Sequence, residues 1–246
     1  MADGLWLIDG PPAQGTRLRL PTRAVVVRLS DGTLWLYAPT RLTPELCDSL
    51  DALGTLAHIV APAPSRLDTL PDWLEHYPKA RFWAAPGVME RAAQLSIPLR
   101  KPRALDRKDA GADWREDLHQ LLVQGHPDHA EAVFFHRSSD TLIVCDLISA
   151  VETAHLSAWM RPVIWLLGLD DAVGRMPRWL RRGVRDEMAL ADSVERMIGW
   201  GPRRIILSQG RWYRRDGVAE LERAFRHILR DRQWEKALRQ MDSGSR

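Results

Sequence analysis

Residues 118–147 constrain the fold more than any other part of this sequence, because short apolar runs alternate there with polar turns. Leu118–Val123 is a short apolar run, and two further runs, Glu131–Phe135 and Thr141–Leu147, are rich in β-branched or aromatic residues. All three have the length of strands. The last two are separated by the polar turn Arg137–Asp140. The pattern predicts a β-hairpin, preceded by a further strand, in the middle of the chain.

Side chains that can bind a metal gather at the mouths of this hairpin. His126 and His129 precede its first strand, and Asp146 lies at the end of its second strand. A rigid sheet can aim such short side chains at one point, and zinc takes imidazole nitrogen and carboxylate oxygen at about 2.0–2.2 Å. Solvated loop histidines and an aspartate that caps the next helix would give the same pattern, so the residues alone leave both interpretations open.

The order GHPDHAEAVFFH…TLIVCDL resembles a segment of the metallo-β-lactamase superfamily, in which a metal-binding His follows a Gly and a later strand ends in the Asp that bridges two metals. His126 and Asp146 stand at those two positions. The segments Ala57–Val60 and Trp73–Gly87 are similar to the first metal loop of the superfamily with its helix and next strand, and Arg204–Gly210 is similar to the late strand and loop. The chain is closest to a branch of unknown function.

The resemblance implies an α/β (α+β) fold, the single-domain αββα four-layer sandwich of the superfamily. Two mixed or mostly antiparallel sheets would stack face to face, with helices on both outer faces. A chain of 246 residues, 45% of them hydrophobic, can bury such a core. We expect this domain to span residues 1–215, and residues 216–246 to add an amphipathic helix that packs on the same domain and ends in a frayed tail.

Two departures from the superfamily pattern bear on function. Where the HxHxDH motif belongs, the chain reads APAPSRLD over residues 61–68 and has no His, and Gln209 stands where a late His is expected. His126 and Asp146 remain from the usual set. Because a catalytic zinc normally needs three protein ligands and an open position, the sequence predicts a degenerate site without the dinuclear metal centre.

Two hypotheses of function follow from these departures. The first, which the missing motif favours, is a non-catalytic binding or scaffold protein with no cofactor, whose partner is an unknown small molecule or protein. The second is a hydrolase with a rewired site for one divalent metal, zinc, iron or manganese. Its ligands would be His126, His129 and Asp146, joined by Asp68 or His58.

His136 is a further candidate, for the role of general base. It ends a predicted strand beside Arg137, and histidine titrates near neutral pH. A structural histidine that satisfies local hydrogen bonds in the hairpin would have the same surroundings in the sequence.

An arginine-rich segment, MPRWLRRGVRD, covers residues 176–186. One interpretation is a weak contact with an anionic or membrane surface. The other is a solvated helix face whose charges pair with Asp186 and Glu187. The arginines concerned are Arg178, Arg181, Arg182 and Arg185.

Composition places few further limits on function. The formal net charge of +3 is too small to indicate nucleic acid as a partner. No segment has the run of about 20 apolar residues that a membrane-spanning helix needs, and the first residues lack the features of a signal peptide. Cys47 lies in a predicted helix and Cys145 in a predicted buried strand, which indicates reduced core residues in a cytoplasmic protein.

Elsewhere the chain alternates strand-like and helix-like runs. Thr43, Pro44 and Gly54 predict a capped helix over Pro44–Leu53. Residues 96–113 form a long polar surface loop, of a kind that is more often functional or mobile than filler. We expect strands over Leu5–Ile8, Ala24–Leu29, Thr33–Ala38, Ala57–Val60 and Arg81–Ala85, and helices over Leu67–His76, Val88–Leu95, 151–169 in two pieces, 187–200 and 218–238.

Overall fold

The computed structural model describes residues 3–12, 21–106, 113–150 and 174–232. The two helical pieces expected over 151–169 and the frayed tail lie outside the described residues, as does part of the long polar loop. Among the helices that the described ranges contain, none is long and apolar enough to cross a membrane.

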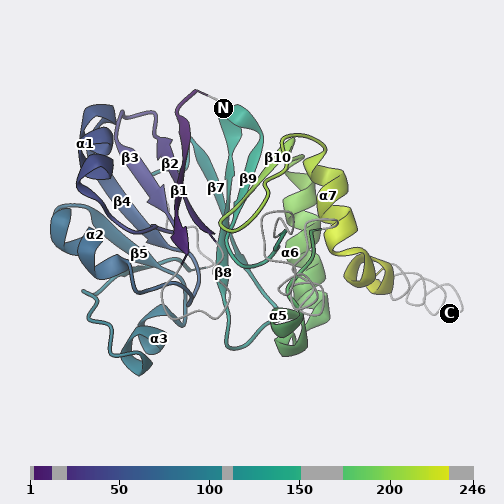
Figure 1. Ribbon diagram of the computed structural model, residues 1–246. Coiled ribbons are helices and arrows are strands. Elements are labelled where there is room, and N and C mark those ends of the chain that lie inside the picture. The colour runs from purple at the N-terminus through teal and green to yellow at the C-terminus, as the bar shows by residue number, and fades with distance from the viewer. Residues whose placement is uncertain (1–2, 13–20, 107–112, 151–173, 233–246) are drawn as a thin grey trace, which may run out of the picture.

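Two sheets lie against each other in the middle of the molecule (Figure 1). The first sheet has the strand order β1-β2-β3-β4-β5-β6, antiparallel from β1 to β3 and parallel from β3 to β6. The second has the order β10-β9-β8-β7, in which only β9 and β10 are parallel. The strands are β1 Leu5–Pro12, β2 Pro21–Arg28, β3 Leu34–Tyr37, β4 Leu56–Ala61, β5 Arg81–Ala84, β6 Arg103–Ala104, β7 Leu118–Val123, β8 Glu131–His136, β9 Thr141–Val144 and β10 Arg204–Leu207.

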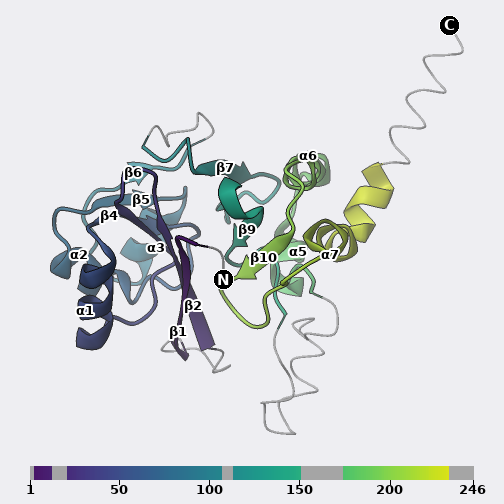
Figure 2. The same cartoon turned by 90° about the horizontal axis from the view of Figure 1, so that it is seen from above.

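Helices cover the outer face of each sheet, so that four layers follow one another across the molecule (Figure 2). The first sheet is covered by α1, α2 and α3, and the second by α5, α6 and α7. This is the αββα arrangement that the sequence predicted. The helices are α1 Pro44–Leu53, α2 Leu70–His76, α3 Val88–Gln94, α5 Arg178–Gly183, α6 Glu187–Gly199 and α7 Gly217–Ala224.

Several element boundaries follow from local chemistry. Helix α1 has the bounds that the sequence predicted, because the Thr43 side chain accepts a hydrogen bond from the Leu46 amide and Gly54 ends the last turn. Strand β9 ends at Val144 and not at Leu147, since the next two amides turn to a carboxylate instead of the sheet. The helix expected over 218–238 is interrupted at Phe225, where the backbone leaves helical geometry, and resumes over 226–232.

Strand β6 was not predicted from the sequence. It lies within the long polar loop and adds two residues to the edge of the first sheet beside β5. Both of its residues are exposed, so the apolar pattern that identifies a buried strand is absent there.

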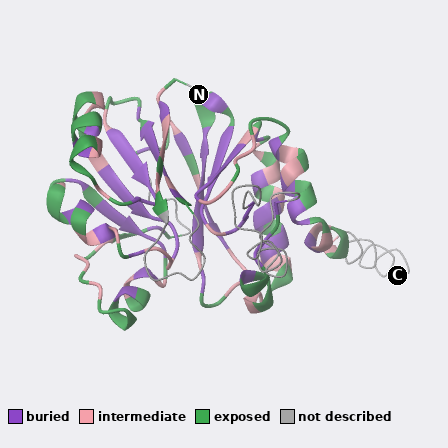
Figure 3. Ribbon diagram, viewed as in Figure 1, coloured by how far each residue is buried: buried purple, intermediate pink, exposed green. Residues whose placement is uncertain are grey.

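The inner strands are largely buried, whereas the edge strands β1 and β6 are mostly not, and the helices expose their outer faces (Figure 3). Between the sheets, the Phe134 ring from the second sheet stands edge-on to Trp35 and Tyr37 of the first, with ring centroids 4.7 and 5.7 Å away. Trp114 packs edge-on against Trp35 at 6.1 Å. These four rings are fully or almost fully buried and hold the two sheets together.

The last strand and the loop after it connect distant parts of the chain. Strand β10 pairs in parallel with β9. Just beyond it, the Ser208 carbonyl accepts a hydrogen bond of 2.8 Å from the Arg23 amide, and the Arg23 guanidinium donates to the Gly210 carbonyl at 2.7 Å. The start of β2 is thereby fastened to the late loop.

Candidate functional site

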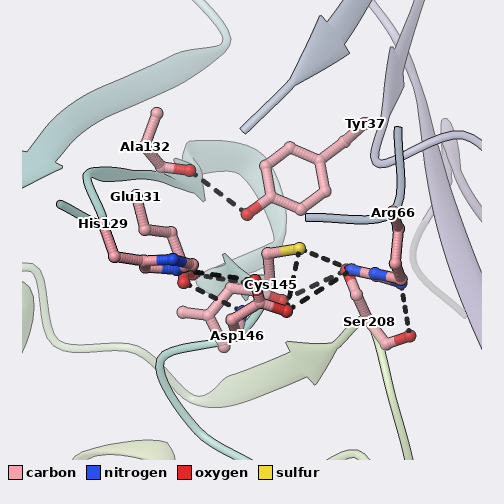
Figure 4. A network of polar contacts seen from close by, with 9 residues as sticks. Tyr37, Arg66, His129, Glu131, Ala132, Cys145, Asp146 and Ser208 are labelled. Carbon is pink, nitrogen blue, oxygen red and sulfur yellow. Dashed lines mark hydrogen bonds and ion pairs between the residues drawn. The ribbon is translucent and has the colours of Figure 1, made fainter. Parts of the chain in front are cut away.

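A network of polar side chains lies where β8 begins and β9 ends (Figure 4). Glu131, the first residue of β8, is buried, and its two carboxylate oxygens accept hydrogen bonds from the amides of Cys145 and Asp146 at 2.6 and 2.9 Å. Glu131 therefore holds the turn after β9 in place. That turn directs the Asp146 side chain toward the loop that precedes β8.

Arg66 reaches the same network from the loop that follows β4. Its guanidinium donates hydrogen bonds to the Cys145 sulfur and, at 3.2 Å, to the Ser208 carbonyl, and it lies 4.0 Å from Asp146 Oδ1. Only 11% of the Arg66 side chain is exposed. Its backbone has the left-handed φ of 51°, a conformation that costs roughly 1–3 kcal/mol and persists only where the surroundings hold it. A fixed positive charge thus lies at the ends of β4, β9 and β10.

His129 meets Asp146 from the opposite side to Arg66 (Figure 4). The distance from His129 Nε2 to Asp146 Oδ2 is 3.5 Å, and both atoms are buried without a hydrogen-bond partner among the described residues. One ligand atom each from His129, Glu131 and Asp146 lie within 4.8 Å of one another. Two ligand atoms of a tetrahedral zinc at about 2.0–2.1 Å stand roughly 3.3–3.4 Å apart, so the gap between His129 and Asp146 fits one metal ion.

Burial governs the charges of this network. It lowers the pKa of His129, against the opposing effect of Asp146, so the imidazole is neutral near pH 7 and keeps a lone pair for a ligand. Burial and the Asp146 charge raise the pKa of Glu131 to about 8. Burial also raises the pKa of the Cys145 thiol, although Arg66 opposes this effect, so the sulfur stays protonated.

His126 lies near His129 but is enclosed by a helix. Its ring centroid is 5.9 Å from that of His129, and its Nδ1 accepts a hydrogen bond from the Asp128 amide at 3.2 Å. A Cβ added to Gly183 of α5 would lie 2.0 Å from His126 Nε2. The helix end therefore packs directly on the nitrogen that is left for a metal, and the imidazole that faces Asp146 is that of His129.

His58 and His136 lie away from Asp146. His58 is buried on β4, where its Nδ1 accepts a hydrogen bond of 3.1 Å from Trp83 Nε1 and its charged neighbours are Asp113, Arg81, Asp31 and Arg103. His136 ends β8, the strand that Glu131 begins, about 17 Å away at 3.4 Å per residue. Its Nδ1 forms a hydrogen bond of 2.7 Å with the Ser139 hydroxyl.

The other two predicted site residues lie in loops. Asp68 is exposed between β4 and α2, two residues after Arg66. Gln209 is half-buried and its backbone pairs with that of Thr22, which places it in the late loop that fastens β2.

Sequence reasoning did not single out Arg66 or Glu131. The sequence did contain an indication of the role of Glu131. Apart from the terminal His, it is the one charged residue in the apolar run EAVFFH, and a carboxylate buried in a strand needs hydrogen-bond partners. For Arg66 the signal was weaker. It stands within the segment APAPSRLD, which was interpreted only through the histidines that it lacks.

Comparison with known proteins agrees with this fold. A family model described as "Domain of unknown function (DUF4336)" matches residues 3–209. The chain belongs to this family. No match to a curated protein was found for the DUF4336 chain.

Solved metallo-β-lactamases share the fold of this DUF4336 protein. VMB-1 is 10% identical with a TM-score of 0.64, and the match covers 94% of this chain and 95% of that one. A metallo-β-lactamase from Erythrobacter litoralis is 16% identical with a TM-score of 0.61, covering 91% and 93%. FIM-1 from Pseudomonas aeruginosa, solved in its mono-zinc form, is 12% identical with a TM-score of 0.61, covering 93% and 94%. The predicted superfamily fold is confirmed.

Proposed function

We propose that this DUF4336 protein is a non-catalytic binding protein built on the metallo-β-lactamase fold. The observation that carries the proposal is the position of Arg66. Its guanidinium supplies a positive charge to Asp146 from the loop in which the superfamily motif would place metal-binding histidines. A carboxylate buried in this way needs a cation or hydrogen-bond donors, and Arg66 meets that need without a metal ion.

The proposal extends to the surroundings of the site. Its partner is a small molecule or a protein, not a nucleic acid, since the net charge of the whole chain is only +3. A cytoplasmic location is supported by two buried cysteines that form no disulfide.

A second candidate function is a metal-dependent hydrolase with one metal ion. It is favoured by the two buried atoms without partners, His129 Nε2 and Asp146 Oδ2, that face each other across 3.5 Å. His129, Asp146 and Glu131 would hold the ion. A bound divalent metal supplies Lewis acidity and lowers the pKa of a coordinated water. Glu131 has both oxygens engaged by backbone amides, so it would serve better to orient Asp146 than to act as a strong third ligand.

Metal content separates the two candidates. Protein purified without chelator should contain well under one equivalent of zinc, iron or manganese. With His129 and Asp146 as its only two strong ligands, the site would have much less metal-binding free energy than the roughly 10–16 kcal/mol of a complete structural zinc site. The Arg66→Ala variant should take up more zinc than the wild type, since the buried Asp146 carboxylate loses its cation. Elemental analysis and zinc titration measure both.

The control is His136→Ala, which removes a buried histidine from the far end of β8. One equivalent of metal in the wild type that is lost in His129→Ala and Asp146→Asn, but kept in His136→Ala, would overturn the proposal in favour of the hydrolase. A zinc affinity unchanged by Arg66→Ala would show that Arg66 does not substitute for a metal.

A further inference from the structure

Helix α5 exposes a face of basic residues. Leu180 points into the core, where it is only 2% exposed, and the other side of this short helix faces solvent. Trp179 and Arg182 are three residues apart and are neighbours on that side. Arg181, on the same helix, and Arg185, which follows it, are also exposed. We call Trp179, Arg181, Arg182 and Arg185 the α5 surface.

The arginines of the α5 surface lack an ion-pair partner within the part of the chain that the structure describes. The Asp186 carboxylate accepts a hydrogen bond from the Ala189 amide at 2.9 Å and so caps helix α6. Among the described residues, the side chains of Arg181, Arg182 and Arg185 form no ion pair. No ion pair in the described part of the chain joins these arginines to Asp186 or Glu187, although all of these side chains are exposed.

Trp179 contributes an exposed aromatic ring to the same surface. It is 53% exposed, and Leu95 is the other large hydrophobic side chain exposed in the described part of the chain. One edge of the Trp179 ring is held by His129, whose ring lies edge-on at 5.2 Å. A tryptophan held at its inner edge and flanked by arginines has the amphipathic character of residues that settle at the headgroup level of a bilayer.

We propose that the α5 surface docks this protein reversibly on an anionic lipid membrane. Each basic residue near such a surface strengthens binding about fivefold, and the attraction acts within a Debye length of about 8 Å at physiological ionic strength. The indole ring adds apolar contact at the interface. The membrane is the partner favoured here because three cations without an ion pair among the described residues share helix α5 and its end with an exposed indole. A purely ionic partner would need the cations alone. This inference does not depend on whether the site binds metal.

Vesicle co-sedimentation of the full-length protein tests the proposal. The protein should bind vesicles of phosphatidylcholine mixed with phosphatidylglycerol, fail to bind vesicles of phosphatidylcholine alone, and be released by salt. Each single substitution Arg181→Gln, Arg182→Gln or Arg185→Gln should lower the partition coefficient about fivefold, and the triple variant roughly a hundredfold.

A matched control exists after β10. Arg211, Arg214 and Arg215 are also exposed, and the Arg214 guanidinium lies 5.1 Å from the ring centroid of Trp212. The triple variant with Gln at these three positions has the same net charge as the α5 triple variant. It should keep most of the vesicle binding, because its arginines lie outside the α5 surface.

The ring of Trp179 gives an independent measurement. Brominated phospholipids should quench part of the tryptophan fluorescence of the wild type, and Trp179→Phe should remove that part. Equal losses of vesicle binding in the two triple variants would overturn the proposal, because they would indicate attraction by net charge. Absence of vesicle binding would overturn it too. The same holds if these arginines bind a soluble polyanion such as single-stranded RNA while the protein does not bind vesicles.

Discussion

The buried carboxyl groups of Glu131 and Asp146 are stabilised by different partners. Glu131 receives two backbone donors, whereas Asp146 has Arg66 on one side and His129 on the other. A metal ion and a guanidinium can meet the same electrostatic need, but a guanidinium offers no open coordination position. The proposal of a binding protein rests on this difference.

His58 provides a test of how burial affects a single side chain. Burial lowers its pKa to about 4, and Trp83 donates to its Nδ1. In the unfolded chain the pKa of histidine is about 6.5, so the unfolded state binds the proton more readily between these two values. The stability that the neutral His58 contributes is fully present above about pH 6.5 and is lost as the pH falls toward about 4.

The expected result is a pH-dependent difference between the wild type and His58→Gln. Glutamine keeps an acceptor for Trp83 but does not titrate. As the pH falls from about 6.5 to about 4, the free energy of unfolding of the wild type should decline relative to the variant by up to about 3 kcal/mol. Urea denaturation across this range measures it, and parallel curves for the two proteins would contradict the expectation.

At single positions, the sequence predicted residue types better than partners. Asp146 and His129 were singled out, and the structure brings them together. Their neighbour Arg66 could not be predicted, because its role depends on a left-handed backbone at φ 51° and on contacts with Cys145 and Ser208, which are far from it in the sequence. Only the folded loop reveals that its guanidinium lies 4.0 Å from Asp146 Oδ1.

Helix α6 depends on Asp186, the residue that one interpretation paired with arginines. As the N-cap, its carboxylate accepts from the Ala189 amide. Asp186→Ala should lower the free energy of unfolding by about 1 kcal/mol. Asp186→Asn should lower it much less, because asparagine caps helices about as well. Thermal denaturation at low and high salt distinguishes a helix cap from an ion pair. If both variants lose the same stability at low salt and none at high salt, Asp186 acts through an ion pair and not as a cap.

Single helices and strands were predicted well wherever their signals are local. The bounds of α1 follow from its cap residues, and β7 follows from its apolar run. Errors occurred where tertiary contacts override the pattern. Strand β9 is shorter than predicted because Glu131 captures the amides that follow it, and β6 is held only by its pairing with β5.

The packing of the two sheets depends on Phe134. Phe134→Ala should lower the free energy of unfolding by about 3–5 kcal/mol, because a buried aromatic ring leaves a cavity between rings from both sheets. Far-ultraviolet and near-ultraviolet circular dichroism should still give one shared transition. Leu95→Ala, at a residue that is 48% exposed, is the control and should change the free energy by no more than about 0.5 kcal/mol. Two separate transitions in the wild type would contradict a shared core.

The four-layer architecture could be predicted because the strand and helix order resembles a known superfamily, and the shared fold is confirmed by solved structures. The order of strands within each sheet could not be derived from apolar patterns. Nothing local in residues 204–207 indicates that they pair with β9 in parallel, since that pairing depends on segments that are distant in the sequence.

Strand β10 and the loop after it have a consequence for how the chain folds during synthesis. The contact of Arg23 with Gly210 joins residues 187 positions apart, and β9 has its β10 neighbour only once residues 204–207 have left the ribosome. Until then the nascent chain carries an apolar strand with an open edge, which is a template for pairing with other chains. Folding dominated by such distant contacts is slow. We therefore expect the exposed edge of β9 to be the segment that most needs a chaperone during synthesis.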